Sequence, residues 1–67
     1  MNLQKLGDNL KKARNKSLLT QLELAKKVGI NANYYARIER GEETPSMEVL
    51  EAISKVLKVK SADILPF

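Results

Sequence analysis

The chain has 67 residues and a formal net charge of +4, and it contains neither cysteine nor histidine. Disulfides, thiolate metal sites and the usual general base near neutral pH are therefore excluded, and we expect neither an enzyme nor a cofactor. A chain of this size forms one domain that buries only ~60% of its unfolded surface, so it needs a well-packed helical core or a partner.

The first predicted element is an amphipathic helix near the N-terminus. Apolar side chains recur there at spacings of three and four residues, at Leu3, Leu6, Leu10 and Ala13, which is the stripe that one helix face turns toward a core. Gly7 interrupts this helix at a cost of roughly 1 kcal/mol relative to alanine. A close packing contact at Gly7 would explain its presence.

The second predicted helix opens at a capping box, Thr20-Gln-Leu-Glu23, in which a hydroxyl is followed three residues later by a carboxylate. Its inner face consists of Leu24, Ala25 and Val28. Gly29 then supplies the left-handed residue that ends a helix.

The third predicted helix begins at Asn31, a residue type that caps helices well. Tyr35 and Ile38 form its buried side, with Tyr34 at the margin, and Gly41 ends it as Gly29 ends the previous helix. Only a tight turn fits between the two helices. Two short helices joined by a turn that contains glycine are typical of a helix-turn-helix.

The remaining sequence predicts two further helices and no strand. Pro45 and Ser46 start the fourth helix. Its inward residues are Met47, Leu50, Ile53 and Leu57. Val59 anchors the next turn, and residues 61–65 form one last helical turn. We therefore expect an all-α, compact five-helix fold that occupies residues 1–67 as a single domain.

The positive charge is concentrated in the predicted helix-turn-helix half. Residues 1–40 carry nine Lys or Arg and three Asp or Glu, a net +6, whereas residues 41–67 carry three and five, a net −2. Such an asymmetry favours binding to a polyanion, although a solvated basic surface would give the same counts.

The outward face of the third helix has the chemistry of a DNA reader. With Tyr35 and Ile38 buried, the period of ~3.6 residues turns five side chains outward: Ala32, Asn33, Ala36, Arg37 and Arg40. Arginine can grip guanine, asparagine can grip adenine, and an alanine methyl can meet a thymine methyl. The alternative is that Asn33 and Arg37 are ordinary surface residues.

Phosphate contacts are expected around this helix. Gln21 lies at the N-terminus of the second helix, where free N–H groups and the helix dipole favour an anion. Further candidates flank the helix pair, namely Asn31, Tyr34, Arg40, Thr44 and Lys16. Contacts of this kind position a protein on DNA without specifying sequence.

The whole pattern resembles the XRE family, the Cro/phage-repressor type of helix-turn-helix. The motifs that carry the resemblance are Leu6–Lys11 with Arg14, Leu19–Gln21 with Leu24–Ala25, Gly29–Asn31, Arg37–Gly41, Pro45–Ser46, and Leu50, Ile53, Leu57 and Val59. Departures from the family pattern occur at Tyr35, where an aliphatic residue is usual, at Lys58, where glycine is common, and at Leu18 and Leu22, where we expect partial exposure.

The resemblance implies a lambda-repressor-like HTH cro/C1-type domain and assigns roles to matching positions. Gln21 would touch a phosphate, and Ala32, Asn33 and Arg37 would read bases. Arg14 and Glu39 would form an internal salt bridge, which makes Glu39 structural. Dimerisation through the C-terminal part is common in such proteins, and the apolar residues that the internal pattern does not use there are Val56, Ala62, Leu65 and Phe67.

We therefore expect a transcriptional regulator that binds a palindromic operator as a homodimer, like a phage-type repressor or a restriction–modification controller. The domain leaves no room for a small-molecule effector module, although the chain could be an excised part of a longer regulator. No apolar stretch suits a membrane span or a signal peptide, so a cytoplasmic protein is expected. The alternatives are a protein-interaction adaptor with the same fold, and peripheral membrane binding by the basic first helix.

Overall fold

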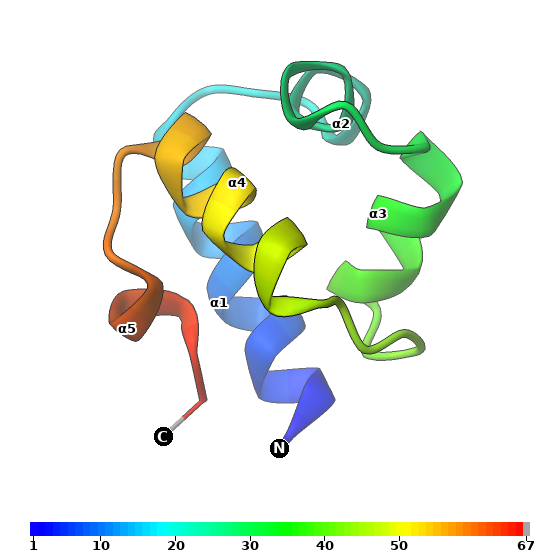
Figure 1. The fold of residues 1–67 in the computed structure, drawn as a ribbon, viewed down its shortest axis with the longest axis vertical. Helices are drawn as coiled ribbons and strands as arrows, with labels where there is room; N and C mark the ends of the chain where they lie inside the picture. Colours follow the sequence, from blue (N-terminus) through cyan, green and yellow to red (C-terminus); the bar gives the residue numbers. More distant parts are fainter. Residues whose placement is uncertain (67) are drawn as a thin grey trace.

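The computed structural model describes residues 1–66, so Phe67 lies outside the described residues. Five helices follow one another along the chain (Figure 1): α1 (Leu3–Lys16), α2 (Gln21–Val28), α3 (Ala32–Glu39), α4 (Met47–Leu57) and α5 (Ser61–Ile64). No strand occurs within this part of the chain, and the all-α, five-helix expectation is confirmed. None of the helices in residues 1–66 combines the length and the apolar character that crossing a bilayer requires.

The helices surround one core, with α1 between α3 and α5 (Figure 1). In addition, α2 packs against α3 and α4, and α4 packs against α5. Every helix contributes apolar side chains that are almost fully buried, namely Leu6, Leu10, Leu24, Ala25, Tyr35, Ile38, Leu50, Ile53, Leu57 and Ile64. In Figure 1, α2 lies at the top and α3 below it on the right, whereas α5 lies on the left, across α1 from α3.

One detail of the expected core differs in the structure. Met47 was expected to face inward, but it is the first residue of α4 and 52% of its surface is exposed. The apolar side chains of α4 contact the core only from Val49 and Leu50 onward. Val28, the last residue of α2, is half-buried and packs against the core, as expected for the inner face of that helix.

The helix-turn-helix is bounded by the local signals that the sequence contains. The Thr20 hydroxyl accepts a hydrogen bond from the backbone N–H of Glu23, whose carboxylate accepts from the Thr20 N–H. Gly29 ends α2 with φ of 88°, in the left-handed region that favours glycine. The Asn31 side chain then caps α3 by accepting from the N–H groups of Asn33 and Tyr34. The predicted caps are confirmed.

Gly7 is the point at which α1 and α3 touch backbone to backbone. A Cβ atom placed on Gly7 would overlap the carbonyl oxygen of Glu39 and would lie 2.9 Å from that of Ile38. The expected close packing contact is therefore present. It fixes α3 against α1 at a separation that any larger residue would increase.

Candidate nucleic-acid interface

The surface of interest is the outward side of α3. Asn33 and Arg37 are exposed on it, whereas Tyr35, Ile38 and Glu39 on the opposite side are buried. Ala36 is half-buried beside them, whereas Ala32, which was expected to face outward, is half-buried and packs against the core. Of the three residues expected to read bases, the structure exposes Asn33 and Arg37 together on one short helix and places Ala32 at the edge of its outward side.

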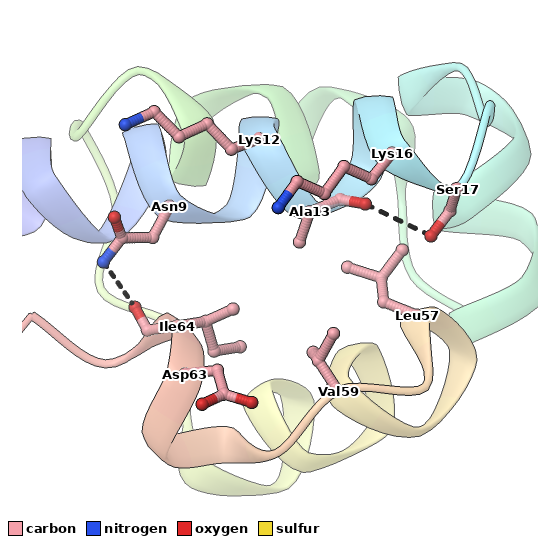
Figure 2. Close-up of a pocket in the computed structure, with 9 residues that line it drawn as sticks. All are labelled: Asn9, Lys12, Ala13, Lys16, Ser17, Leu57, Val59, Asp63 and Ile64. Atoms are coloured by element: carbon pink, nitrogen blue, oxygen red, sulfur yellow. Dashed lines mark hydrogen bonds between the residues drawn. The ribbon is translucent and has the colours of Figure 1, made fainter.

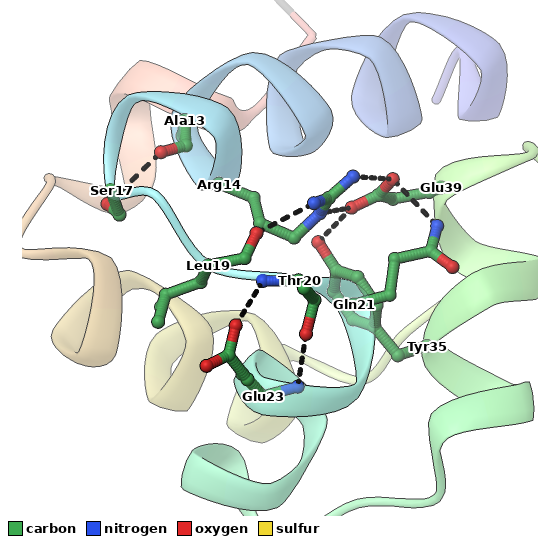
Figure 3. A network of polar contacts seen from close by, with 9 residues as sticks. All are labelled: Ala13, Arg14, Ser17, Leu19, Thr20, Gln21, Glu23, Tyr35 and Glu39. Atoms are coloured by element: carbon green, nitrogen blue, oxygen red, sulfur yellow. Dashed lines mark hydrogen bonds and ion pairs between the residues drawn. The ribbon is translucent and has the colours of Figure 1, made fainter.

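A buried polar network lies directly beneath this helix (Figure 3). Arg14 from α1 contacts Glu39 from α3 through two hydrogen bonds, from Nε to Oε2 at 2.6 Å and from Nη2 to Oε1 at 3.2 Å. The Tyr35 hydroxyl donates to Oε2 of the same carboxylate at 2.5 Å. The ion pair expected between Arg14 and Glu39 is thus present, and it links the first helix to the third.

The network also explains the tyrosine that departs from the family pattern. Tyr35 is fully buried, and a buried hydroxyl without a partner would be costly. Burial and the hydrogen bond to the neighbouring Glu39 carboxylate both raise the pKa of Tyr35 above its ordinary value. The phenol therefore stays protonated and serves as a permanent donor to Glu39.

Glu39 remains ionised inside this network. Burial by itself would raise the pKa of the carboxyl group, but hydrogen bonds from Arg14, Tyr35 and Gln21, together with the positive charge of Arg14, outweigh that effect and hold its pKa below the usual 4.5. The hydrogen bond from the Arg14 guanidinium to the carboxylate likewise raises the pKa of Arg14. Both groups are therefore charged at neutral pH.

Gln21 connects the network to the surface. Its Nε2 donates to Glu39 Oε1 at 3.0 Å, and the side chain is half-buried at the start of α2 (Figure 3). A glutamine amide has two N–H donors, and this contact uses one of them. The geometry is compatible with the phosphate contact expected for Gln21, because the second N–H can serve another acceptor.

Two acidic residues in the loop after α3, Glu42 and Glu43, contact basic residues at the end of α3. Arg37 Nε lies 3.5 Å from Glu43 Oε2. Arg40 donates from Nε and Nη2 to the Glu42 carboxylate at 3.0 and 3.2 Å. The sequence contains a signal for these pairs. Glu42 and Glu43 follow Gly41 two and six residues after Arg40 and Arg37, and a glycine that ends a helix turns the chain back toward it.

The remaining phosphate candidates do not all lie on this side of the molecule. Asn31, Tyr34, Arg40 and Thr44 belong to α3 or its flanking loops, with Tyr34 half-buried and the others exposed. Lys16 is different, since successive helix residues turn by about 100° and it points roughly opposite to Gly7 on α1.

Lys16 instead lines a groove of about 540 Å³ between α1 and the α4–α5 segment (Figure 2). Lys12 and Asp63 also border it, and Asn9 closes one end by donating from Nδ2 to the Ile64 carbonyl at 3.1 Å. The structure therefore does not bring Lys16 together with the outward side of α3.

The residues expected to form a dimer interface are only partly available. Val56 and Leu65 are half-buried and pack against the core, so the expectation that the internal pattern does not use them is wrong. Ala62 is exposed. Phe67 lies outside the described residues.

Comparison with known proteins places this geometry in a family. The family model described as Helix-turn-helix matches residues 10–64, which include all of α2 and α3. The chain belongs to the XRE-type helix-turn-helix family. Members of this helix-turn-helix family are DNA-binding transcription regulators and not enzymes.

Two curated relatives of this chain are named as a repressor and as a transcriptional regulator. It is 35% identical to the immunity repressor protein of Bacillus phage phi105 over 60 residues, which are 90% of this chain and 42% of the repressor. It is 36% identical over 58 residues to an uncharacterized HTH-type transcriptional regulator of Archaeoglobus fulgidus, covering 87% of this chain and 82% of that protein. The chain thus spans less than half the length of its phage relative.

Solved structures of helix-turn-helix regulators are also similar. The crystal structure of the clp gene regulator ClgR from Corynebacterium glutamicum matches 96% of this chain and 68% of its own, with a TM-score of 0.91 and 28% identity. The restriction-modification controller protein C.AhdI from Aeromonas hydrophila matches 94% of this chain and 96% of its own, with a TM-score of 0.91 and 25% identity.

Proposed function

We propose that this chain is a sequence-specific transcriptional regulator that binds operator DNA as a homodimer, with α3 in the major groove. The observation that carries the proposal is the pair Asn33 and Arg37, exposed one helical turn apart on a helix whose opposite side is buried. An α-helix with its side chains is about 10–12 Å across, so it fits the major groove, which is ~12 Å wide.

Each base-reading residue of α3 would recognise a different base, according to its chemistry. Arg37 would donate to guanine O6 and N7, and Asn33 would pair with adenine N6 and N7. The small side chain of Ala32 would meet a thymine methyl and lets the helix backbone approach the bases closely. The two adjacent phosphate backbones would be contacted by residues within α3 or near it, namely Gln21, Asn31, Tyr34, Arg40 and Thr44.

Homodimerisation would supply the specificity that one short helix lacks. A single α3 spans about half a turn of DNA, whereas a two-fold dimer places two such helices one turn, or 10–10.5 base pairs, apart. The operator would then be a palindrome. The proposed contact consists of the exposed Ala62, the exposed parts of the half-buried Val56 and Leu65, and Phe67. Repression is the proposed outcome, in keeping with the name of the phage relative.

The proposal is tested by selection from duplexes with a randomised core of about two helical turns. Bound duplexes should converge on a palindrome. The affinity for the selected duplex should also fall steeply with salt, because binding releases counterions from the DNA and this release is less favourable at high salt concentration. A protein that selects no sequence, or whose binding does not respond to salt, would contradict the proposal.

Substitution of Arg37 tests the docking model itself. Arg37→Ala should cost about 1–3 kcal/mol on the selected duplex and should abolish the preference at one base pair of each half-site. Arg40→Ala should instead weaken all duplexes by a similar factor, because it removes a phosphate contact. Lys12→Ala, in the groove on the side of α1 that faces α5, is the matched control and should leave the base preference unchanged. An unchanged affinity and base preference in Arg37→Ala would rule out this docking.

A further inference from the structure

The loop after α3 is held in a fixed position beside the exposed arginines. Gly41 N–H donates to the Ile38 carbonyl at 3.1 Å, and Glu42 N–H donates to the Arg37 carbonyl at 2.9 Å. These are the two hydrogen bonds that close a helix of this type at a left-handed glycine. Pro45 is buried at the other end of the loop. The backbone of Glu43 is therefore anchored on both sides.

The two arginines meet their carboxylates differently: Arg40 makes two hydrogen bonds to Glu42, whereas Arg37 has one longer ion-pair contact with Glu43. Glu42 occupies both Nε and Nη2 of Arg40. Glu43 lies against Nε of Arg37 at 3.5 Å, and both side chains are between one third and one half exposed. A guanidinium group carries five N–H donors, of which Nε has one and the two terminal nitrogens have four. The carboxylate of Glu43 thus stands beside the stem edge of Arg37 and leaves the terminal nitrogens for another acceptor.

This edge-on contact matches what a base-reading arginine needs. A bidentate contact with guanine O6 and N7 uses two parallel N–H donors, and the terminal nitrogens supply such a pair. The side chain of Arg37 is long and flexible, and ordering one such side chain at an interface costs about 2- to 10-fold in affinity. A neighbouring carboxylate on Nε reduces this cost by ordering the side chain before DNA arrives.

We infer that Glu43 is a positioning residue for Arg37: the attraction of its carboxylate, 3.5 Å from Nε, orients the guanidinium so that the terminal nitrogens face the guanine edge. The inference rests on the proposed function, because it assumes that Arg37 reads a base. Glu43 itself touches no DNA in this arrangement. Its effect is confined to the base pair that Arg37 contacts.

The charge of Glu43 alone would predict a different effect on DNA binding from a positioning role, so the two can be told apart. Glu43 places a negative charge near a surface that binds phosphates, so its removal should tighten binding to every duplex. A positioning role predicts that discrimination falls even though the net charge becomes more favourable. Glu42 offers the matched control, since it is the neighbouring residue, has the same charge and pairs with Arg40, which is proposed to contact phosphate.

The experiment compares Glu43→Gln with Glu42→Gln in the intact chain. The probes are the duplex that the wild type selects from the randomised pool, the same duplex with the Arg37-dependent base pair changed, and a scrambled duplex. Glu43→Gln should lower the ratio of affinities for the first two by about 3- to 10-fold. Glu42→Gln should raise the affinity for all three together and leave that ratio unchanged.

The double variant Arg37→Ala/Glu43→Gln tests whether Glu43 acts through Arg37. There Glu43→Gln should leave the ratio at that base pair unaltered, because the side chain that it positions is gone. Thermal unfolding of both glutamine variants should match the wild type, since exposed ion pairs contribute little to stability.

If Glu43→Gln raises all three affinities as Glu42→Gln does, Glu43 acts only through its charge and the inference is wrong. If the wild type selects no duplex at all, the proposed function fails first, so the two failures are distinguishable.

Discussion

At the scale of single residues, the inward-facing Glu39 carboxylate accepts more side-chain hydrogen bonds than any other described group of the candidate interface. Its two oxygens accept hydrogen bonds from Arg14, Tyr35 and Gln21. One carboxylate thereby joins α1, α2 and α3 at the point where Gln21 reaches the surface. Since both members of the ion pair with Arg14 are almost fully buried, removing either would strand a charge, at a cost of about 3–5 kcal/mol.

The Tyr35 hydroxyl gives a testable pH dependence. Because the folded pKa of Glu39 is below 4.5, its charged form stabilises the fold above that pH, and this contribution is lost as the pH falls through the folded pKa. Tyr35→Phe removes one donor to the carboxylate. We expect a loss of about 1.5–3 kcal/mol at neutral pH, measured by urea unfolding.

The loss in Tyr35→Phe should shrink as the pH falls through the lowered folded pKa of Glu39 and the carboxylate becomes protonated in both proteins. Tyr34→Phe is the matched control, since Tyr34 is half-buried on the same helix, and it should change stability by less than about 0.5 kcal/mol. A difference between wild type and Tyr35→Phe that stayed constant with pH would show that the hydroxyl does not act through the charged carboxylate.

At the scale of elements, the helix ends could be predicted because their causes are local. Thr20, Gly29 and Asn31 act on backbone groups within a few residues, so the sequence contains both partners of each contact. Lys58 extends this reasoning, because it ends α4 with φ of 58°, in the left-handed region where the family pattern has glycine. The prediction that Met47 is buried was wrong because the spacing of apolar residues does not show at which residue a helix first contacts the core.

Gly7 provides the prediction that belongs to this scale. On an exposed helix, replacing glycine by alanine adds up to about 1 kcal/mol of stability. Here the new methyl group would overlap the Glu39 carbonyl, so Gly7→Ala should destabilise the protein by about 1–3 kcal/mol and move α3 away from α1. Lys11→Ala, at an exposed position of the same helix, should change stability by less than about 0.5 kcal/mol. A stabilised Gly7→Ala variant, measured by thermal unfolding, would contradict the observed crossing.

At the scale of the whole molecule, the parts that could not be predicted are those set by how the helices pack. The sequence indicated that Asn33 and Arg37 share a face. It did not show that Lys16 lies on the other side of α1 or that Val56 and Leu65 are half-buried, because these depend on how α1, α3, α4 and α5 pack against one another. The contacts of Glu42 and Glu43 were missed because they need the loop to turn back on α3.

The proposed dimer gives a prediction about the assembled molecule. Ala62 is exposed, so Ala62→Glu should leave the fold intact and shift the protein toward monomer in sedimentation equilibrium, by placing two like charges near the two-fold axis. Glu48→Lys, at an exposed position near the start of α4, should leave the association unchanged. A wild type that stays monomeric at high micromolar concentration would exclude this interface.

The backbone contact at Gly7 has a consequence for how such a domain can change its target. Because α3 rests on α1 through main-chain atoms and is fixed from below by Tyr35, Ile38 and Glu39, its position does not depend on the side chains that point outward. Replacements at the outward positions can therefore accumulate without disturbing the scaffold. The residues that hold α3 in place are therefore distinct from the exposed Asn33 and Arg37, so a new DNA target could be acquired by few substitutions on an unchanged frame.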